Sequence, residues 1–394
     1  MTSAAADIRY RWNMGPEARL VLLITACLLA FGLATVYSAS AIYAQNKGFS
    51  SGYFILRHLI GVAAGIVALA IFSKVDAERW SRWSWPIMFL TIFLLLLIIL
   101  PFTEHIAPRL RGSRRFMIGS SLQPSELGKI AVIMWTSMLI VKKGDVLRRL
   151  TKGLLPFLVI IGLLDVLVAL EPDLSVAMMY TLTMGIILFA GGVRIGHFVV
   201  LGILAVPLLW TQMERLNYAL LRMTAFFDPG SAPTHVSDQL RQSLIAVGSG
   251  RLFGVGFGQG RQPLGFLPLA YDDFIAGSIG EEWGFVGMLV LILAFAAFTY
   301  LGFRIARSAR TQFQQLVAVG ITTTIVITAY LHIGVVIGML PTTGLTLPFV
   351  SYGRSNMVLS LLMTGVLVNI GSTHEKVIGS RATDPSFAMQ RAPA

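Results

Sequence analysis

The sequence contains little cysteine and little charge. Cys27 is the only cysteine among 394 residues, so no disulfide can form within the chain. It lies in an apolar run, which predicts a small core residue. Charged residues make up 13% of the chain, whereas soluble domains carry about 25%. Because 55% of the residues are hydrophobic, we predict an integral membrane protein with no sizeable soluble domain.

Several catalytic motifs are also absent from the sequence. The six histidines are scattered and form neither HExxH nor part of a cysteine-rich zinc motif. No Walker motif, serine nucleophile elbow or dinucleotide fingerprint is present, so ATP-driven chemistry is not expected. The glycines between 248 and 260 resemble a phosphate loop only superficially, because no Lys-Ser/Thr pair follows them.

Apolar runs of about 20 residues, each long enough to cross a bilayer, recur along the whole chain. They predict an all-α polytopic bundle of about ten transmembrane helices within a single domain, residues 1–394. The predicted spans are 18–43, 55–73, 84–102, 126–142, 153–171, 174–193, 195–212, 275–303, 315–340 and 355–373. An even number of spans places both termini on one side of the membrane.

The net charge of +12 is explained by topology rather than by nucleic-acid binding, because cytoplasmic loops collect Lys and Arg. Basic residues crowd the connections 74–82, 142–152 and 304–310 and the segment before the first span. These parts are therefore predicted to be cytoplasmic. The C-terminal segment 374–394 is predicted to be a flexible cytoplasmic tail.

The opposite side carries basic residues that topology does not require. Arg109, Arg111, Arg114 and Arg115 lie in the short external segment 103–125. Guanidinium groups bind phosphates and carboxylates through paired hydrogen bonds, so these residues predict an anionic ligand at the outer membrane surface. A basic loop that pairs with lipid headgroups is the alternative.

The longest connection, 213–274, is predicted to be external and functional, because structureless loops beyond about 15 residues are uncommon. Residues 239–250 within it have an amphipathic helical pattern, with Leu240, Leu244 and Val247 on one side. This pattern favours a helix that lies along the membrane interface.

Two pairs of acidic residues lie beside strongly apolar sequence. Asp272 and Asp273 stand at the bilayer boundary, where a carboxylate can act as a general base toward a hydroxyl group. The alternative is that they cap the next helix or lie in its first turn. Glu281 and Glu282 lie about two turns deeper, where an ionisable group indicates a functional site, so one of them is predicted to face a polar cavity.

Further polar residues lie at the outer ends of the predicted spans. Glu126 and Lys129 are three residues apart on one helix face, so either they pair together or Lys129 faces a ligand. Asp173 either caps a helix or lines the site. The segment 340–357 holds two prolines and two glycines, and irregular backbone at membrane depth predicts a re-entrant or cavity-lining loop. At its end, Arg354 contacts an anion or lies on the surface.

The sequence resembles the SEDS family, the polytopic cell-wall polymerases typified by FtsW and RodA, from about residue 15 to 372, and is closer to FtsW. The motifs are GSRRFMIGSSLQPSELGK, EPDLS, FFDPGSAP, QSLIAVGSGRLFGVGFGQG, LPLAYDDFIAGSIGEEWGFVG and LPTTGLTLPFVSYG. The resemblance implies ten spans in the bacterial inner membrane, cytoplasmic termini and a large extracytoplasmic loop between spans seven and eight. It also implies peptidoglycan glycosyltransferase activity on lipid II, in division or elongation.

The resemblance extends to individual residues. Asp273 matches the catalytic acid/base of the family, which would deprotonate the acceptor sugar hydroxyl, and Asp272 stands where the family usually has Thr. The residues expected to bind the substrate are Arg114, Arg115, Lys129, Glu126, Asp173, Arg222, Gln242, Ser243 and Ser351. The four cations in this set would stabilise the departing polyprenyl pyrophosphate.

The resemblance also implies a cofactor and partners. A divalent cation, Mg²⁺ or Mn²⁺, is expected to help, although the sequence shows no recognisable motif for it. The implied partners are a class B penicillin-binding protein that acts as transpeptidase and other membrane proteins of the divisome or elongasome, whereas nucleic acid is not expected.

The sequence departs from the family pattern at several outward positions. These are Phe116, Asp238, Leu269, Tyr271, Arg354 and Asn356. The departures put the substrate preference, the pairing with a partner and the catalytic competence in question. Two alternatives therefore stay open, a flippase that moves the same lipid-linked precursor and a non-catalytic scaffold of a cell-wall complex.

Overall fold

The computed structural model describes residues 8–100, 103, 115–117, 122–199, 217–227, 234–261, 267 and 270–378. Most of these residues are helical. The helices are α1 (Pro16–Asn46), α2 (Tyr53–Phe72), α3 (Trp80–Ile99), α4 (Pro124–Lys143), α5 (Leu155–Leu170), α6 (Leu174–Ala190), α8 (Asn217–Phe227), α9 (Thr234–Ser249), α10 (Ile275–Arg307), α11 (Gln312–Val336) and α12 (Arg354–Ile370). Short helical turns occupy Ala77–Arg79, Gly144–Arg148 and Leu150–Leu154, and the strands are β1 (Ile8–Met14) and β2 (Ser372–Ile378).

The predicted spans coincide with helices wherever the structure describes them. Helices α1 to α6 and α10 to α12 occupy nine of the ten predicted positions, and most of the remaining span, 195–212, lies outside the described residues. Within the described part, six helices are long and apolar enough to cross a bilayer, and α6 and α12 are shorter apolar helices. The all-α prediction is confirmed, while the number of ten spans stays a prediction.

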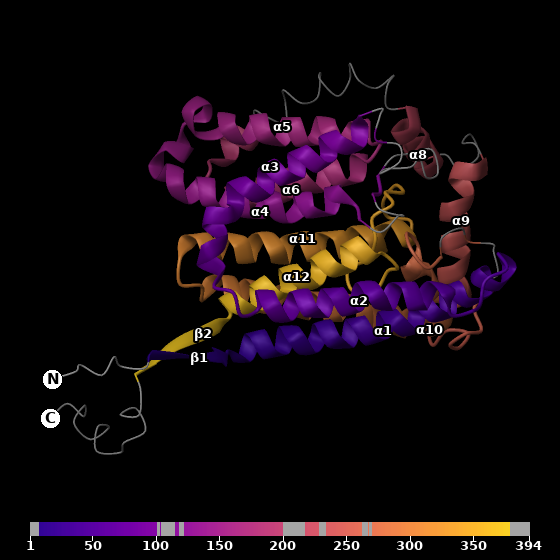
Figure 1. The fold of residues 1–394 in the computed structure, drawn as a ribbon. Helices are drawn as coiled ribbons and strands as arrows, with labels where there is room; N and C mark the ends of the chain where they lie inside the picture. Colours follow the sequence, from indigo (N-terminus) through magenta and orange to yellow (C-terminus); the bar gives the residue numbers. More distant parts are fainter. Residues whose placement is uncertain are drawn as a thin grey trace, which may run out of the picture.

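Helix α11 lies at the centre of the bundle. It packs against α4, α6, α10 and α12, and Figure 1 shows it between the group α3 to α6 and the group α1, α2, α10 and α12. Its buried residues run from Phe313 to Val336 and cover every face of the helix. A helix that is hydrophobic all round is expected in such a position.

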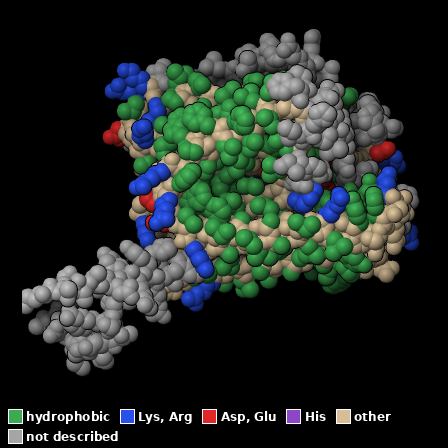
Figure 2. All heavy atoms as spheres, in the orientation of Figure 1, with side chains coloured by type: hydrophobic (Ala, Val, Ile, Leu, Met, Phe, Trp, Pro, Cys, Tyr) green, Lys and Arg blue, Asp and Glu red, His purple; other side chains and the backbone are tan. Residues whose placement is uncertain are grey.

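Basic residues and both terminal segments mark one end of the bundle. Strands β1 and β2 pair antiparallel, with Ile8 opposite Ile378, so the two ends of the described chain lie together (Figure 1). Arg304 and Glu17 form an ion pair of 2.9 Å at this end. Figure 2 shows Lys and Arg side chains along the same end and a broad hydrophobic band over the middle. The strand includes residues 374–378, the first part of the predicted tail.

Helix α9 crosses the other end of the bundle (Figure 1). It packs against α10 and α11, and its buried residues include Leu240, Ser243 and Ala246. The helix predicted in this segment is confirmed. On its predicted apolar side, Leu240 is buried, Val247 is half-buried and Leu244 is exposed, and the placement along the membrane interface stays a prediction. Leu244 is 44% exposed and its neighbour Ile245 is 46% exposed.

Helix α10 is interrupted at Gly284, whose φ of 64° is accessible to glycine at little cost. The interruption releases backbone groups in residues 281–286, and the glycine-rich segment 251–256 binds them. For example, the Phe285 amide donates to the carbonyl of Arg251 at 2.9 Å. The break is therefore satisfied by protein, as irregular backbone in a membrane protein requires.

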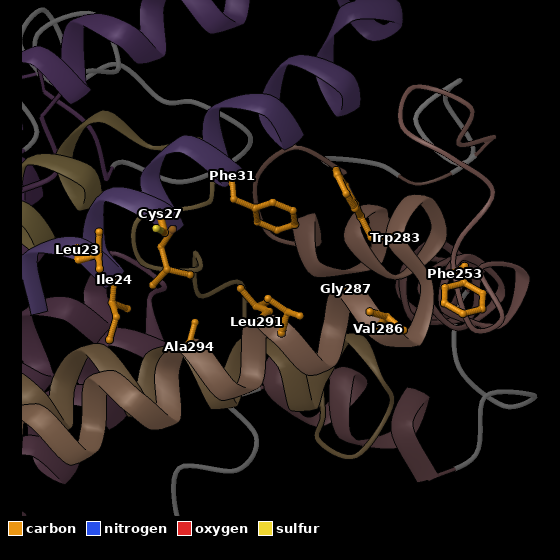
Figure 3. Close-up of a pocket in the computed structure, with 12 residues that line it drawn as sticks. Leu23, Ile24, Cys27, Phe31, Phe253, Trp283, Val286, Gly287, Leu291 and Ala294 are labelled. Carbon is orange, nitrogen blue, oxygen red and sulfur yellow. The ribbon is translucent and has the colours of Figure 1, made fainter. Parts of the chain in front are cut away.

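An apolar groove of about 620 Å³ lies between α1 and α10. Figure 3 shows Cys27 and Phe31 of α1 on one side and Leu291 of α10 on the other. Cys27 is exposed there, so the prediction of a core position was wrong. The groove lining contains no acidic or basic side chain, so this groove is separate from the candidate site.

Candidate active site

Strands β1 and β2 form a two-stranded ribbon, which we call the terminal ribbon. The candidate site lies at the opposite end of the bundle, where the first residues of α4, α6, α10 and α12 meet. The segment between α11 and α12 connects them. Each helix N-terminus carries a partial positive charge from its aligned peptide dipoles. The arrangement therefore favours an anionic ligand before any side chain is considered.

The two aspartates lie in the turn that leads into α10, and both are partly exposed. The N-cap of this helix is Phe274, so neither aspartate occupies the capping position. Asp273 faces Gly344, because a Cβ placed on that glycine would lie 3.7 Å from Asp273 Oδ2. The backbone of Asp272 is held by the Ser351 hydroxyl, which donates to its carbonyl at 2.8 Å. The turn thus presents Asp273 toward the α11–α12 segment.

Two serines that we expected to bind substrate are buried behind this turn. Ser351 also accepts the Leu347 amide at 2.8 Å, and Ser243 donates to the carbonyl of Val336 at 2.8 Å. They are 1% and 0% exposed. In this structure both hydroxyls hold the backbone rather than face a ligand space. Gln242, the neighbour of Ser243 on α9, is half-buried.

Arg115 binds the turn between α5 and α6. Its Nε donates to the Glu171 carbonyl at 3.1 Å and its Nη2 donates to the Pro172 carbonyl, while Nη1 lies 3.5 Å from Asp173 Oδ2. Asp173 occupies the N-cap position of α6, but its side chain makes no capping hydrogen bond. The carboxylate is therefore committed to Arg115 instead of the helix. Arg114, its predicted partner at the site, lies outside the described residues.

Glu171, at the start of the same turn, is a buried carboxyl group that the sequence did not single out. It is 2% exposed, and neither of its carboxylate oxygens has a hydrogen-bond partner among the described residues. Burial raises the pKa of Glu171 to about 8, and the Asp173 carboxylate raises it further while Arg115 opposes the shift. Glu171 is therefore largely protonated at neutral pH.

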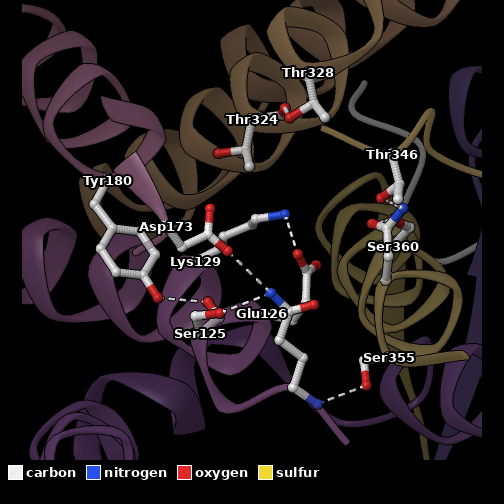
Figure 4. A network of polar contacts seen from close by, with 12 residues as sticks. Ser125, Glu126, Lys129, Asp173, Tyr180, Thr324, Thr328, Thr346, Ser355 and Ser360 are labelled. Carbon is white, nitrogen blue, oxygen red and sulfur yellow. Dashed lines mark hydrogen bonds and ion pairs between the residues drawn. The ribbon is translucent and has the colours of Figure 1, made fainter. Parts of the chain in front are cut away.

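Lys129 and Glu126 form a buried ion pair on the first turns of α4, with 2.6 Å between Nζ and Oε1. Of the two alternatives, mutual pairing is the one that the structure contains. Figure 4 shows this pair in one polar cluster with Asp173 and Ser355. Gln123 joins the cluster, since its side-chain Nε2 donates to Asp173 Oδ2 at 3.4 Å and its backbone N–H donates to Ser355 Oγ at 2.8 Å.

Arg222, on α8, donates from Nη1 to the Thr342 carbonyl at 3.0 Å. The guanidinium is half-buried and reaches the α11–α12 segment from outside the bundle. The structure therefore brings Arg222 to the same segment that faces Asp273. Residues of α6, α8 and α12 and of the turn that precedes α10 contact the α11–α12 segment, so its irregular backbone lies at the candidate site. That it is re-entrant or lines a cavity stays a prediction.

Two residues that depart from the family pattern, Tyr271 and Asn356, make well-defined contacts within the protein. Tyr271 is 4% exposed and its ring lies 4.8 Å from that of Phe54 and 5.6 Å from that of Tyr352. Asn356 donates to Thr346 Oγ1 at 2.6 Å and accepts from Ser360 at 3.1 Å. Leu269 lies outside the described residues.

Glu281 and Glu282 are buried beside the glycine-rich loop. Glu281 accepts the Arg261 amide at 2.8 Å, and Glu282 accepts hydrogen bonds from the Ser38 hydroxyl and from the backbone of Gly258 and Gly260. Both are 2% exposed. Among the described residues, backbone N–H groups of the glycine-rich loop bind both carboxylates, so the pair holds this loop against α10. A polar cavity beside one of them stays a prediction.

Sequence reasoning missed His332, Ser175 and Gln123. His332 carried a usable signal, because an ionisable residue in an apolar helix indicates a function. Its Nδ1 lies 2.7 Å from the Leu345 carbonyl. Ser175 and Gln123 carried no such signal, because their partners are a backbone carbonyl and residues distant in sequence.

The expected divalent cation has no cage among the described residues. No group of three or more His, Cys, Asp or Glu side chains lies together there. Asp173 and Glu126 are each paired with a cation, which lowers their value as metal ligands. The described residues thus do not fit a bound metal ion, and Mg²⁺ or Mn²⁺ stays a prediction with no part in the mechanism below.

Comparison with known proteins decides the family. A family model described as "Cell cycle protein", for FtsW, RodA and SpoVE, matches residues 18–376. The chain belongs to this FtsW/RodA/SpoVE family. With its apolar helices, this membership identifies a multi-pass membrane protein and confirms the resemblance found in the motifs.

Individual FtsW/RodA/SpoVE relatives cover nearly the whole chain. A probable peptidoglycan glycosyltransferase FtsW of Trichlorobacter lovleyi is 38% identical over 93% of this chain and 96% of its own length. The stage V sporulation protein E of Bacillus subtilis is 36% identical over 89% of this chain and 96% of its own length. A solved peptidoglycan synthase complex, which coordinates polymerization and crosslinking, contains a chain with a TM-score of 0.73 at 21% identity. That match covers 89% of this chain and 96% of the solved chain, and it supports the fold.

Proposed function

We propose that this protein is a peptidoglycan glycosyltransferase that polymerises lipid II at the outer face of the cytoplasmic membrane. Family membership over most of the chain and relatives named peptidoglycan glycosyltransferase support the activity. The observation that carries the proposal is the position of Asp273. It is a partly exposed carboxylate that faces Gly344 where four helix N-termini meet.

Asp273 acts as the general base in this mechanism. The 4-hydroxyl of the acceptor sugar attacks the anomeric carbon of the lipid-linked muramyl sugar, and Asp273 takes the hydroxyl proton. The bond between that carbon and the pyrophosphate oxygen breaks, and its electron pair leaves with the polyprenyl pyrophosphate. Such proton transfer contributes about 10²- to 10⁴-fold to rates in enzymes.

The leaving pyrophosphate gathers negative charge, which the site is suited to stabilise. We assign to it Arg222 and Lys129, whose ammonium group pairs with Glu126 and would also attract the pyrophosphate, together with the helix N-termini. Arg115 contributes by fixing Asp173 and the α5–α6 turn at the same site. Arg114 belongs to this set by sequence and lies outside the described residues.

We further propose that both termini are cytoplasmic. The basic connections at the end that carries the terminal ribbon support this orientation, since cytoplasmic loops collect Lys and Arg. Reporter enzymes fused to the N-terminus and to the external segment between α8 and α9 test it. We expect the N-terminal fusion to be active with a reporter that works only in the cytoplasm, and the fusion between α8 and α9 to be active with a reporter that works only outside it. The reverse pattern would overturn the orientation.

A class B penicillin-binding protein is the partner that we propose for crosslinking. The similarity in fold to a chain of a peptidoglycan synthase complex supports such a partner. Affinity purification of the tagged full-length protein from membranes is expected to recover one transpeptidase in stoichiometric amounts. Recovery of the protein without any transpeptidase would remove this part of the proposal.

The activity is tested with purified full-length protein and labelled lipid II. We expect glycan strands from the wild type and none from Asp273→Asn. Asp145→Asn, an exposed residue of the basic connection at the other end, is the matched control and should polymerise normally. Transbilayer movement of lipid II without polymer would instead support a flippase, and normal growth of cells that carry only Asp273→Asn would support a scaffold.

A further inference from the structure

Residues 342–345 of the α11–α12 segment, which we name the strap, contain Gly344, the residue that faces Asp273. Gly344 lies in the strap with a φ of +77°, a conformation that favours glycine. A Cβ at this residue would contact Asp273 Oδ2 at 3.7 Å. The position of the strap therefore determines how much space the Asp273 carboxylate has.

Side chains from three helices hold the strap by its carbonyl groups. Ser175 of α6 donates to the Thr343 carbonyl, and Arg222 of α8 donates to the Thr342 carbonyl at 3.0 Å. His332 of α11 contacts the Leu345 carbonyl through Nδ1 at 2.7 Å. Three of the four strap carbonyls are thus fixed from outside the strap, and the one residue between these anchors is Gly344.

His332 also reaches the helix that follows Asp273. Its Nε2 lies 3.4 Å from the amide nitrogen of Ala276, the second residue of α10. The first four amide groups of a helix have no partner within that helix, and the N-cap residue Phe274 provides no side-chain acceptor. His332 therefore caps α10 from a neighbouring helix.

The two partners of His332 fix the state of its imidazole ring. A carbonyl can only accept, so Nδ1 carries the hydrogen; an amide N–H can only donate, so Nε2 is the acceptor. The ring is neutral and 1% exposed. One side chain thus joins the strap on one side of Asp273 to the helix on the other side.

We propose that His332 is a positioning residue that holds Asp273 against Gly344, an inference that rests on the proposed function. Ser175 and Arg222 fix the other half of the strap. His332 touches no reacting atom. It acts by keeping the α10 start and the strap at a constant separation, and displacement of a catalytic group by about 1 Å can cost about 100-fold in rate.

Four variants of the full-length protein test the proposal. His332→Leu removes both hydrogen bonds at similar volume. His332→Asn places an amide where Nδ1 was and can keep the strap bond, whereas His332→Gln extends to the place of Nε2 and can keep the bond to α10. The matched control is Thr328→Val, a buried residue one turn away whose hydroxyl donates to the Thr324 carbonyl at 2.7 Å and bonds no described residue outside α11.

Two measurements separate positioning from simple stability. In lipid II polymerisation, His332→Leu should lower kcat about 10- to 100-fold with KM changed less than about twofold. The Asn and Gln variants should recover part of the loss, and Thr328→Val should match the wild type. Hydrogen exchange should rise in residues 270–278 and 340–348 in His332→Leu and stay unchanged in Thr328→Val.

The two readouts fail separately. Unchanged exchange in both segments, or a kcat of His332→Leu equal to that of the control, would overturn the role of His332. Absence of polymer from the wild type would overturn the proposed function. The exchange experiment would then still show whether His332 holds the start of α10 and the strap together. If His332→Leu does not fold, the Asn and Gln variants carry the same test, and wild-type kcat in both would contradict the proposal.

Discussion

Lys129 Nζ lies 2.6 Å from Glu126 Oε1, and both side chains are almost fully buried on the first turns of α4. Within the part of the chain that the structure describes, the second carboxylate oxygen of Glu126 has no hydrogen-bond partner. Removal of one member of a buried ion pair leaves an uncompensated charge, which costs about 3–5 kcal/mol, whereas replacement of both is often neutral. The pair is therefore suited to separate structural from catalytic roles.

We predict that Lys129→Met lowers the free energy of unfolding of the purified protein by about 3–5 kcal/mol. The double variant Glu126→Gln, Lys129→Met should recover most of this lost stability. Polymerisation should remain low in the double variant, because the charge near the pyrophosphate is still missing. Thermal unfolding and lipid II turnover measure the two effects. Full turnover in a stable double variant would show that Lys129 is structural only.

A second prediction concerns Arg115, whose three nitrogens bind three consecutive residues of the α5–α6 turn. Lys carries a single ammonium and cannot reproduce this fork. Arg115→Lys should therefore lose nearly as much activity as Arg115→Gln, and hydrogen exchange in residues 171–175 should rise in both. Arg149→Lys, exposed in the basic connection at the other end, is the control. Wild-type exchange in Arg115→Lys would mean that only the charge matters.

Glu171 predicts a pH dependence of stability. Its pKa is about 8 in the folded protein, against an ordinary value of 4.5. The folded state therefore binds more protons between these values, so stability falls as pH rises through this window, by at most about 1.4 kcal/mol per pH unit. Glu171→Gln should flatten the dependence and raise stability at pH 8. Thermal unfolding at pH 5 and pH 8 measures it, with Asp145→Asn as control; an unchanged slope in Glu171→Gln would contradict the assignment.

The two buried glutamates of α10 give a fourth prediction. Glu281 and Glu282 accept backbone hydrogen bonds from the glycine-rich loop, so Glu281→Ala should release this loop. An unsatisfied buried donor costs about 1–3 kcal/mol. Limited proteolysis should then cleave within residues 250–261, whereas Glu281→Gln, which keeps an acceptor oxygen, should resist. Equal cleavage of both variants would show that the carboxylate charge, rather than its acceptor role, holds the loop.

Much of the fold follows from the sequence because transmembrane helices need about 20 apolar residues, a local property. The helices α1, α2 and α11 lie where apolar length predicted them. The candidate site could be proposed from the sequence, since Asp273, Lys129 and Asp173 all belong to motifs near helix N-termini. Which of these charges pair with each other was not predictable, because Arg115 reaches its partners across 56 to 58 positions of the sequence.

The sequence by itself determined a polytopic bundle, its family and the acidic turn before α10, because the length of an apolar run and the order of motifs are properties of neighbouring residues along the chain. Only the tertiary structure decided that Cys27 faces outward, since residues facing lipid and residues facing the core are equally apolar. It also decided that His332 joins α10 to the strap. The partners of that ring are backbone groups, which every residue possesses, so no pattern of side chains along the chain can single them out.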